Sequence, residues 1–350
     1  MDDGSGKSPI LPSNSLLLAA DCPAYVRRAV NPPPVNFDPL DEAPPPPALP
    51  TLAPPPDRPP VLQVRGLRRS FGKLPAVNGV DLTAHEGEIY GFLGINGAGK
   101  TTTIRLIMGI IAAQSGEITL LNETTRRTSV AQKQRIGYVS QEQNFYPWMT
   151  CKALGRFVGS FYPTWDAAEF ARLLAMFEIP ESRRSSELSG GMRAKLALAL
   201  AIAPRPALLI LDEPTAGLDP LARREFMQII VAQAREHRRT TFFSSHLIDE
   251  VERCADRVGI IHQGRMRFEG SLVELRARVR RVTAAANTPL SLPAPAEIWR
   301  DEELLGVRSV IANAEPEIWE AWPNAEANTI TPLTLEEIFI ACVGSRLVRI

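Results

Sequence analysis

The chain has 350 residues and a mass of 38.4 kDa, which is enough for one large domain or two modest ones with a substantial core. Its 39 basic and 39 acidic residues cancel, so the composition lacks the basic excess that is typical of nucleic-acid-binding proteins. Hydrophobic residues make up 45% and charged residues 22%, which indicates a globular protein and excludes a fibrous one.

The sequence gives no sign of secretion or of a membrane span. The chain starts with acidic residues at positions 2 and 3, where a signal peptide is basic. The longest apolar stretch, 196–211, is interrupted by Pro204 and Pro206, and it falls short of the roughly 20 residues that span a bilayer. The cysteines lie far apart with no C-x-x-C pair, which favours free thiols in a reducing compartment: Cys22, Cys151, Cys254 and Cys342.

Residues 1–60 contain 17 of the 31 prolines. A segment so rich in proline lacks backbone donors for regular structure, and this one has few aromatic side chains to bury. We therefore expect a disordered tail. It could be a ligand for a proline-recognising module, a dispensable extension, or the product of a start codon placed too far upstream.

Residues 61–270 alternate short β-branched runs with helical patterns, which predicts an α/β domain with a largely parallel sheet. The predicted strands are 88–93, 135–139, 207–211, 240–243 and 257–261. The predicted helices are 100–108, 166–177, 190–203, 220–236 and 248–253. Residues 142–187 have helical periodicity and read as a helical insert. Residues 271–350 are expected to form a small C-terminal α/β extension, in which the helix Leu335–Val343 is the clearest element.

Residues 94–101 match the pattern G-x-x-x-x-G-K-[ST] between a predicted strand and a predicted helix, the context that a phosphate-binding loop requires. Glycines allow backbone N–H groups to curl around a phosphate, and the helix N-terminus adds partial positive charge. The lysine can reach the β- and γ-phosphates, and the hydroxyl of Thr101 can ligate Mg²⁺. The predicted nucleotide-binding residues of this loop are Gly94, Asn96, Gly97, Ala98, Gly99, Lys100, Thr101 and Thr102.

Asp212 and Glu213 follow the apolar run 208–211, which is typical of a central strand covered on both faces. Open α/β sheets bind ligands at the carboxyl ends of their strands, so both acids should lie beside the phosphate loop. We assign Asp212 to Mg²⁺ and Glu213 to polarising the attacking water. The alternative is that they only cap the strand before Pro214.

The segment Leu188-Ser189-Gly190-Gly191-Met192 precedes a long predicted helix. Two glycines and a serine at a helix N-terminus can hold an anion, although Ser189 could also be an ordinary N-cap. In this position the segment resembles the LSGGQ signature of ATP-binding-cassette (ABC) ATPases, with Met at the fifth position.

Four further segments match landmarks of the same family. Gln141, which lies 41 residues after Lys100, resembles the Q-loop glutamine, and Asp219 in Gly217-Leu218-Asp219 resembles the D-loop. His246 resembles the switch histidine, and Phe71 the aromatic residue that stacks on adenine. The resemblance covers residues 61–270. It implies the fold of an ABC-type P-loop NTPase, with a mostly parallel sheet, an antiparallel β subdomain and the helical insert.

The resemblance also implies activity and partners. Such cassettes hydrolyse ATP with Mg²⁺, and two of them, identical or paralogous, pair head to tail around two ATP molecules. Lys100, Gln141, Glu213 and His246 would be catalytic, and Thr101, Gln141 and Asp212 would hold the metal. Phe71 and Asp219 would contact nucleotide, and Ser189, Gly190 and Gly191 would contact the ATP held by the partner.

The family's transporters place the cassette on the cytoplasmic face of the membrane, attached to permease subunits on separate chains. The helical insert would contact those subunits. The tail 333–339 resembles the end of single-cassette exporters of the multidrug and antibiotic type, which favours export. The transported cargo leaves no mark in this sequence.

Other ATPase classes fit less well. Soluble ABC ATPases of DNA repair or chromosome maintenance carry long coiled coils or zinc modules between the phosphate loop and the signature, but here that interval is 89 residues without heptads or C-x-x-C pairs. Translation factors carry tandem cassettes, and this chain has one. A P-loop GTPase would need an N-K-x-D base reader, which is absent. A catalytically silent cassette is disfavoured because all the catalytic residue types are present.

Overall fold

A computed structural model describes residues 58–125, 128–285, 290, 292–322 and 328–344. The chain divides into two units, residues 1–47 and 48–350, and the first lies wholly outside the described residues. The tail predicted to be disordered, residues 1–60, therefore lies outside the described residues except for its last three positions. No described helix is long and apolar enough to cross a membrane.

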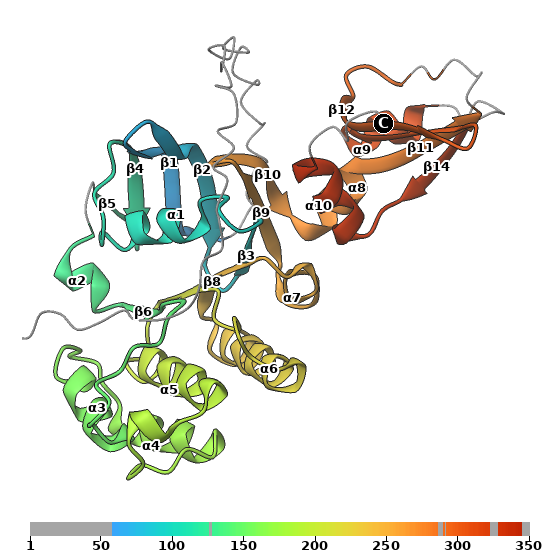
Figure 1. Cartoon of the computed structure of the whole chain (residues 1–350). Coiled ribbons are helices and arrows are strands. Elements are labelled where there is room, and N and C mark those ends of the chain that lie inside the picture. Colours follow the sequence, from blue (N-terminus) through green and yellow to red (C-terminus); the bar gives the residue numbers. More distant parts are fainter. Residues whose placement is uncertain (1–57, 126–127, 286–289, 291, 323–327, 345–350) are drawn as a thin grey trace, which may run out of the picture. The chain divides into compact units, whose positions relative to one another are not determined.

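A six-stranded sheet in the order β10-β9-β3-β8-β7-β6 forms the centre of the α/β part of the chain (Figure 1). Five of its strands run parallel, and β10 pairs antiparallel with β9. The strands are β3 (Ile89–Leu93), β6 (Ile136–Val139), β7 (Leu208–Asp212), β8 (Thr240–Ser245), β9 (Arg257–His262) and β10 (Arg265–Ser271). All five predicted strands are confirmed, with ends that differ by one or two residues. Every residue of β3, β7, β8 and β9 is buried, as expected for parallel strands covered on both faces.

Alternate residues of the central strands enter two different cores. In β3, Tyr90 and Phe92 belong to a cluster with α1 (Lys100–Ile107), whereas Ile89 and Leu93 belong to a second cluster with three helices. Those helices are α5 (Gly190–Ile202), α6 (Pro220–His237) and α7 (Ile248–Cys254). This alternation is the period of two expected for a strand with a core on each face.

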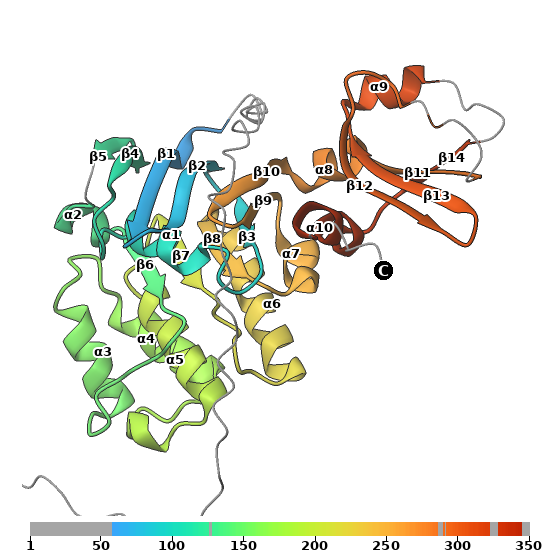
Figure 2. The ribbon, with the colours of Figure 1, turned by 45° about the horizontal axis from the view of Figure 1, so that its top comes forward.

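An antiparallel sheet in the order β2-β1-β4-β5 packs into the same core as α1, which confirms the expected β subdomain (Figure 2). Its strands are β1 (Pro60–Phe71), β2 (Leu74–His85), β4 (Ser115–Leu120) and β5 (Glu123–Thr125), and the short helix α2 (Val130–Lys133) follows.

The segment between β6 and α5 contains the helices α3 (Cys151–Gly159) and α4 (Ala167–Met176) and the 3₁₀ turn η1 (Ser185–Glu187). Gly155 allows α3 to approach α4 closely, because a Cβ atom there would lie 2.2 Å from the ring of Phe170. Asp166 caps α4 by accepting a hydrogen bond from the Glu169 backbone.

The C-terminal part contains more structure than the sequence analysis identified. After α8 (Leu272–Arg278), an antiparallel sheet in the order β12-β13-β11-β14 packs its inner face under α9 (Pro316–Ala321). Its strands are β11 (Val279–Ala285), β12 (Glu297–Leu304), β13 (Val307–Asn313) and β14 (Asn328–Pro332). The predicted helix α10 (Leu335–Val343) is confirmed with the same ends.

Candidate functional site

The loop between β3 and α1 has the backbone geometry of a phosphate cradle. Gly97 and Gly99 adopt φ angles of 80° and 109°, a region that favours glycine. A Cβ atom on Gly99 would also lie 2.5 Å from the carbonyl oxygen of Ala76. Helix α1 begins at Lys100 without a side-chain cap, so its first N–H groups, including those of Thr101 and Thr102, are available to an anion.

Lys100 is buried and lies folded over this loop. Its Nζ atom donates to the carbonyl oxygens of Gly94 at 2.7 Å and Ile95 at 3.1 Å, and it forms a 3.0 Å ion pair with Oε1 of Glu213. The ammonium group of Lys100 is therefore bound by three oxygen atoms, and phosphate oxygens of a nucleotide can take the place of these partners.

Asp212, at the carboxyl end of β7, faces the hydroxyl groups of two other elements. Its Oδ1 atom accepts hydrogen bonds from Oγ of Ser244 at 2.9 Å and from Oγ1 of Thr101 at 3.1 Å. Burial raises the pKa of the Asp212 carboxyl, and the two hydrogen bonds only partly oppose that rise. The Oγ atom of Ser244 also accepts a hydrogen bond from the backbone N–H of Glu213 at 3.0 Å. One serine hydroxyl therefore binds both the Asp212 carboxylate and the Glu213 backbone.

Glu213 lies between a lysine and a histidine. Its second oxygen, Oε2, is 3.0 Å from Nδ1 of His246, which follows the neighbouring strand β8. Glu213 has a φ of 44°, a left-handed backbone conformation that is rare for a residue with a side chain and that ends the extended run of β7. Lys100, Glu213 and His246 thus form a continuous line of hydrogen-bonded charged and polar groups.

Two other predicted site residues, Phe71 and Gln141, form no described hydrogen bond with Lys100, Glu213 or His246. Phe71 is 49% exposed at the end of β1, with the guanidinium of Arg69 5.1 Å from its ring centroid. Gln141 follows β6 at the same sheet edge, and its exposed side chain forms no hydrogen bond with another described residue.

Signature and D-loop residues occupy the starts of two helices. Ser189 caps α5 by accepting from the backbone of Met192 at 3.2 Å, and Gly190 beside it is exposed. Asp219 caps α6, where its Oδ1 accepts from two backbone N–H groups at 3.0 Å. Within one chain these residues act as helix caps, which is the alternative that the sequence left open for Ser189.

Sequence reasoning did not identify Ser244, which connects Asp212 to the backbone of Glu213. The available signal was its place near the carboxyl end of a buried strand, the edge that carries every other polar residue of the site.

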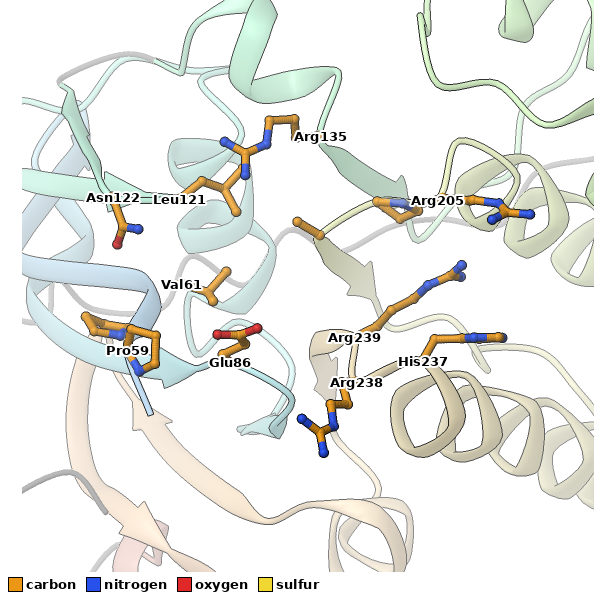
Figure 3. Close-up of a pocket in the computed structure, with 13 residues that line it drawn as sticks. Pro59, Val61, Glu86, Leu121, Asn122, Arg135, Arg205, His237, Arg238 and Arg239 are labelled. Atoms are coloured by element: carbon orange, nitrogen blue, oxygen red, sulfur yellow. The ribbon is translucent and has the colours of Figure 1, made fainter. Parts of the chain in front are cut away.

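A cavity of about 460 Å³ lies at the opposite edge of the sheet, before the amino ends of β3, β6, β7 and β8 (Figure 3). Arg135 lines one side, and Glu86 and Arg238 line the other. None of the predicted site residues lines this cavity, so the nucleotide chemistry and the cavity occupy opposite ends of the strands.

Comparison with known proteins agrees with this geometry. The family model for ABC transporters matches residues 77–216. The ABC transporter ATP-binding protein YtrB of Bacillus subtilis is 31% identical over 299 residues, which cover 82% of this chain and 99% of YtrB. The linearmycin resistance ATP-binding protein LnrL of Bacillus subtilis is 35% identical over 63% of this chain and 72% of LnrL. The bacitracin transport ATP-binding protein BcrA of Bacillus licheniformis is 33% identical over 63% of this chain and 73% of BcrA.

Solved structures agree as well. A structure of an ATP binding subunit of an ABC transporter superposes with a TM-score of 0.57 at 27% identity, and the match covers 62% of this chain and 92% of that one. The extent of the match with YtrB, together with this fold, shows that the chain belongs to the family of ABC transporter ATP-binding proteins, whose cassettes bind and hydrolyse ATP.

Proposed function

We propose that the chain powers an exporter, by pairing head to tail with a second cassette around two ATP molecules and driving membrane-spanning subunits on separate chains. The observation that carries this proposal is the line from Lys100 through Glu213 to His246, which continues from the phosphate loop to two neighbouring strand ends. The names of the relatives LnrL and BcrA, which concern antibiotic resistance and transport, support export.

In the proposed mechanism, the γ-phosphate displaces Glu213 from Lys100. The phosphate oxygens carry more negative charge than the carboxylate, and the N–H groups of the loop add to their attraction. Glu213 is then free to accept a proton from the attacking water, while His246 keeps its carboxylate oriented.

The residues around Asp212 fit Mg²⁺. Its carboxylate and the hydroxyl of Thr101 lie 3.1 Å apart, and both offer the hard oxygen atoms that Mg²⁺ prefers. Protein sites for Mg²⁺ with nucleotides use one or two such ligands and complete the shell with phosphate oxygens and water. Bound there, Mg²⁺ would neutralise phosphate charge, and Gln141 is the proposed additional ligand.

The first test is Asp212→Asn, which we expect to raise the melting temperature of the nucleotide-free chain. The pKa of Asp212 is raised by burial, so its ionised form destabilises the fold at neutral pH, and the isosteric amide removes that cost. A gain of 1 kcal/mol would raise the melting temperature by roughly 2–4 °C for a domain of this size.

The cost is present above the pKa of the carboxyl and is lost as the pH falls through it. The advantage of the variant should therefore shrink at lower pH. In the same scans the added stabilisation by Mg²⁺ with ATP should fall. A variant that melts below the wild type at neutral pH, or that keeps its full Mg²⁺ response, would contradict these assignments.

Exposed aromatic side chains on the helical part are the proposed contact with the membrane-spanning subunits. Tyr146, Trp148, Phe157 and Phe161 form a chain of ring contacts with centroid distances of 5.2–5.7 Å. Trp148 is 68% exposed, and such a group of apolar surface side chains is typical of a protein interface.

Trp148→Ala tests this contact. We expect the ATPase rate and melting temperature of the isolated chain to stay within twofold and about 1 °C of the wild type, because the side chain supports no core. Stimulation of the ATPase by a co-expressed membrane subunit, the product of a neighbouring gene, should fall at least tenfold. The matched control is Leu305→Ala, at an exposed apolar residue of the C-terminal part. Equal stimulation of Trp148→Ala and the wild type would place the contact elsewhere.

Residues 1–57 are proposed to be unnecessary for hydrolysis. The cassette's first strand begins at Pro60, and the sequence before it is rich in proline and poor in aromatic residues that a core could bury. A chain that starts at Arg58 should keep its ATPase rate within twofold and its melting temperature within about 2 °C of the full-length chain. A loss of many degrees would show that this segment docks on the cassette.

A further inference from the structure

Glu250 is a buried carboxylate that the mechanism above does not use. It lies in the first turn of α7 and is 5% exposed. Its Oε1 accepts a hydrogen bond from Oγ1 of Thr215 at 2.5 Å, and its Oε2 accepts one from Oγ of Ser245 at 2.6 Å. The guanidinium of Arg223 approaches Oε1 with Nε at 3.6 Å. Each carboxylate oxygen therefore binds a different segment of the chain.

These segments carry the reacting side chains. Thr215 lies two residues after Glu213, and Ser245 directly precedes His246. The loop from Thr215 leads to Asp219, and Arg223 in α6 holds that loop as well, since its Nη2 donates to the carbonyl oxygen of Leu218 at 3.3 Å. One carboxylate thus connects the end of β7, the end of β8 and the start of α6.

The contact between Glu213 and His246 depends on how these two strand ends are aligned. In the structure Glu213 is held from two sides, by Lys100 at 3.0 Å and by His246 at 3.0 Å. Once a phosphate takes Lys100, His246 alone is left to orient the carboxylate. The alignment of the two loops then determines whether Glu213 faces its water.

We propose that Glu250 is a positioning residue for ATP hydrolysis, which holds the loop after Glu213 in register with the loop of His246 through Thr215 and Ser245. This inference rests on the proposed roles of Glu213 and His246. It adds a residue that acts on Glu213 and His246 only through Thr215 and Ser245, by setting the geometry of their two loops.

Glu250→Gln is the direct test, because the amide keeps the size of the side chain but can accept from only one of the two hydroxyls through its single oxygen. We expect kcat to fall by on the order of 10–100-fold, the scale that small misplacements of catalytic groups produce. The KM for ATP should stay within twofold, since the phosphate loop is untouched. The matched control is Asp249→Asn, which removes the same charge one residue earlier from a side chain that is 79% exposed.

A double-mutant cycle separates positioning from a general effect on folding. If Glu250 acts through His246, Glu250→Gln should cost little further activity in a chain that already carries His246→Ala. If the fold-losses in kcat of the two single variants multiply in the double variant, the proposal is wrong. So would a Glu250→Gln chain as active as the control, or one whose ATP binding and melting temperature fall together with kcat.

Thr215→Val tests the same positioning role of Glu250 if the Glu250→Gln chain does not fold. It removes one hydrogen-bond donor at nearly constant volume and leaves the carboxylate in place. We expect a smaller fall in kcat at unchanged KM, and a wild-type kcat would count against the inference. Failure of the proposed function is recognised separately, because Glu213→Gln would then still hydrolyse ATP.

Discussion

Replacing Glu213 with Gln is expected to reduce ATP turnover by about 10²–10⁴-fold, the range that a positioned general base contributes, and to leave ATP binding intact. The amide can still accept a hydrogen bond, but it cannot take a proton from water. It also ends the 3.0 Å ion pair with Lys100, so the lysine becomes freer to meet the phosphates. ATP binding should therefore be unchanged or tighter while hydrolysis is strongly slowed.

The consequence for assembly follows from the same change. If ATP joins two cassettes and hydrolysis separates them, a chain that binds but does not hydrolyse ATP should remain dimeric. Light scattering with Mg²⁺ and ATP should show this larger species persisting for Glu213→Gln, and only transiently for the wild type. Asp249→Asn, whose side chain is exposed, serves as the charge control. A wild-type rate of hydrolysis in Glu213→Gln would remove this residue from the role of base.

Much of this site could be predicted because short motifs specify backbone geometry locally. The glycines at 97 and 99 require positive φ angles, which the structure has, and the acids at 212 and 213 had to end a buried strand. Parallel strands then bring their carboxyl ends to one edge, so Thr101 and Asp212 meet although 111 residues separate them.

What the sequence did not predict depends on contacts between elements. The role of Glu250 requires that α7 lie against the ends of two strands, and no local pattern indicates that placement. One strand of the C-terminal sheet, Glu297–Leu304, was missed for another reason. It contains no fully buried residue, so it lacks the apolar alternation that identifies a strand with one covered face.

Gly190→Asp is expected to abolish hydrolysis without harming the chain that carries it. A Cβ atom at Gly190 would meet no heavy atom within 4 Å, so the fold has room for a side chain there. Gly190 is exposed and directly follows the N-cap of α5. Its backbone N–H therefore lies at the positive end of that helix. A carboxylate at this point would repel the γ-phosphate of ATP held by a partner cassette. The variant should keep its melting temperature and its affinity for ATP, and lose at least 10²-fold in turnover.

Lys100→Ala damages the opposite wall of the same composite site. It removes the cation that meets the β- and γ-phosphates, so this chain should bind ATP poorly. A mixed dimer of Lys100→Ala and Gly190→Asp chains has one pocket with both walls altered and one with both walls intact. Each pure variant should be nearly inactive, and mixing them should restore a measurable fraction of turnover if the two pockets can act independently.

The single variant decides the question, because absence of rescue in the mixture could also mean that both pockets must act together. If Gly190→Asp alone hydrolyses ATP at the normal rate, the segment at the start of α5 is not part of any active site. The head-to-tail pairing would then be wrong for this protein. If the variant loses hydrolysis but keeps its fold and its bound ATP, the missing interaction must come from outside the chain that holds the nucleotide. The described contacts of Ser189 and Gly190 within one chain leave that face of α5 open to such a partner.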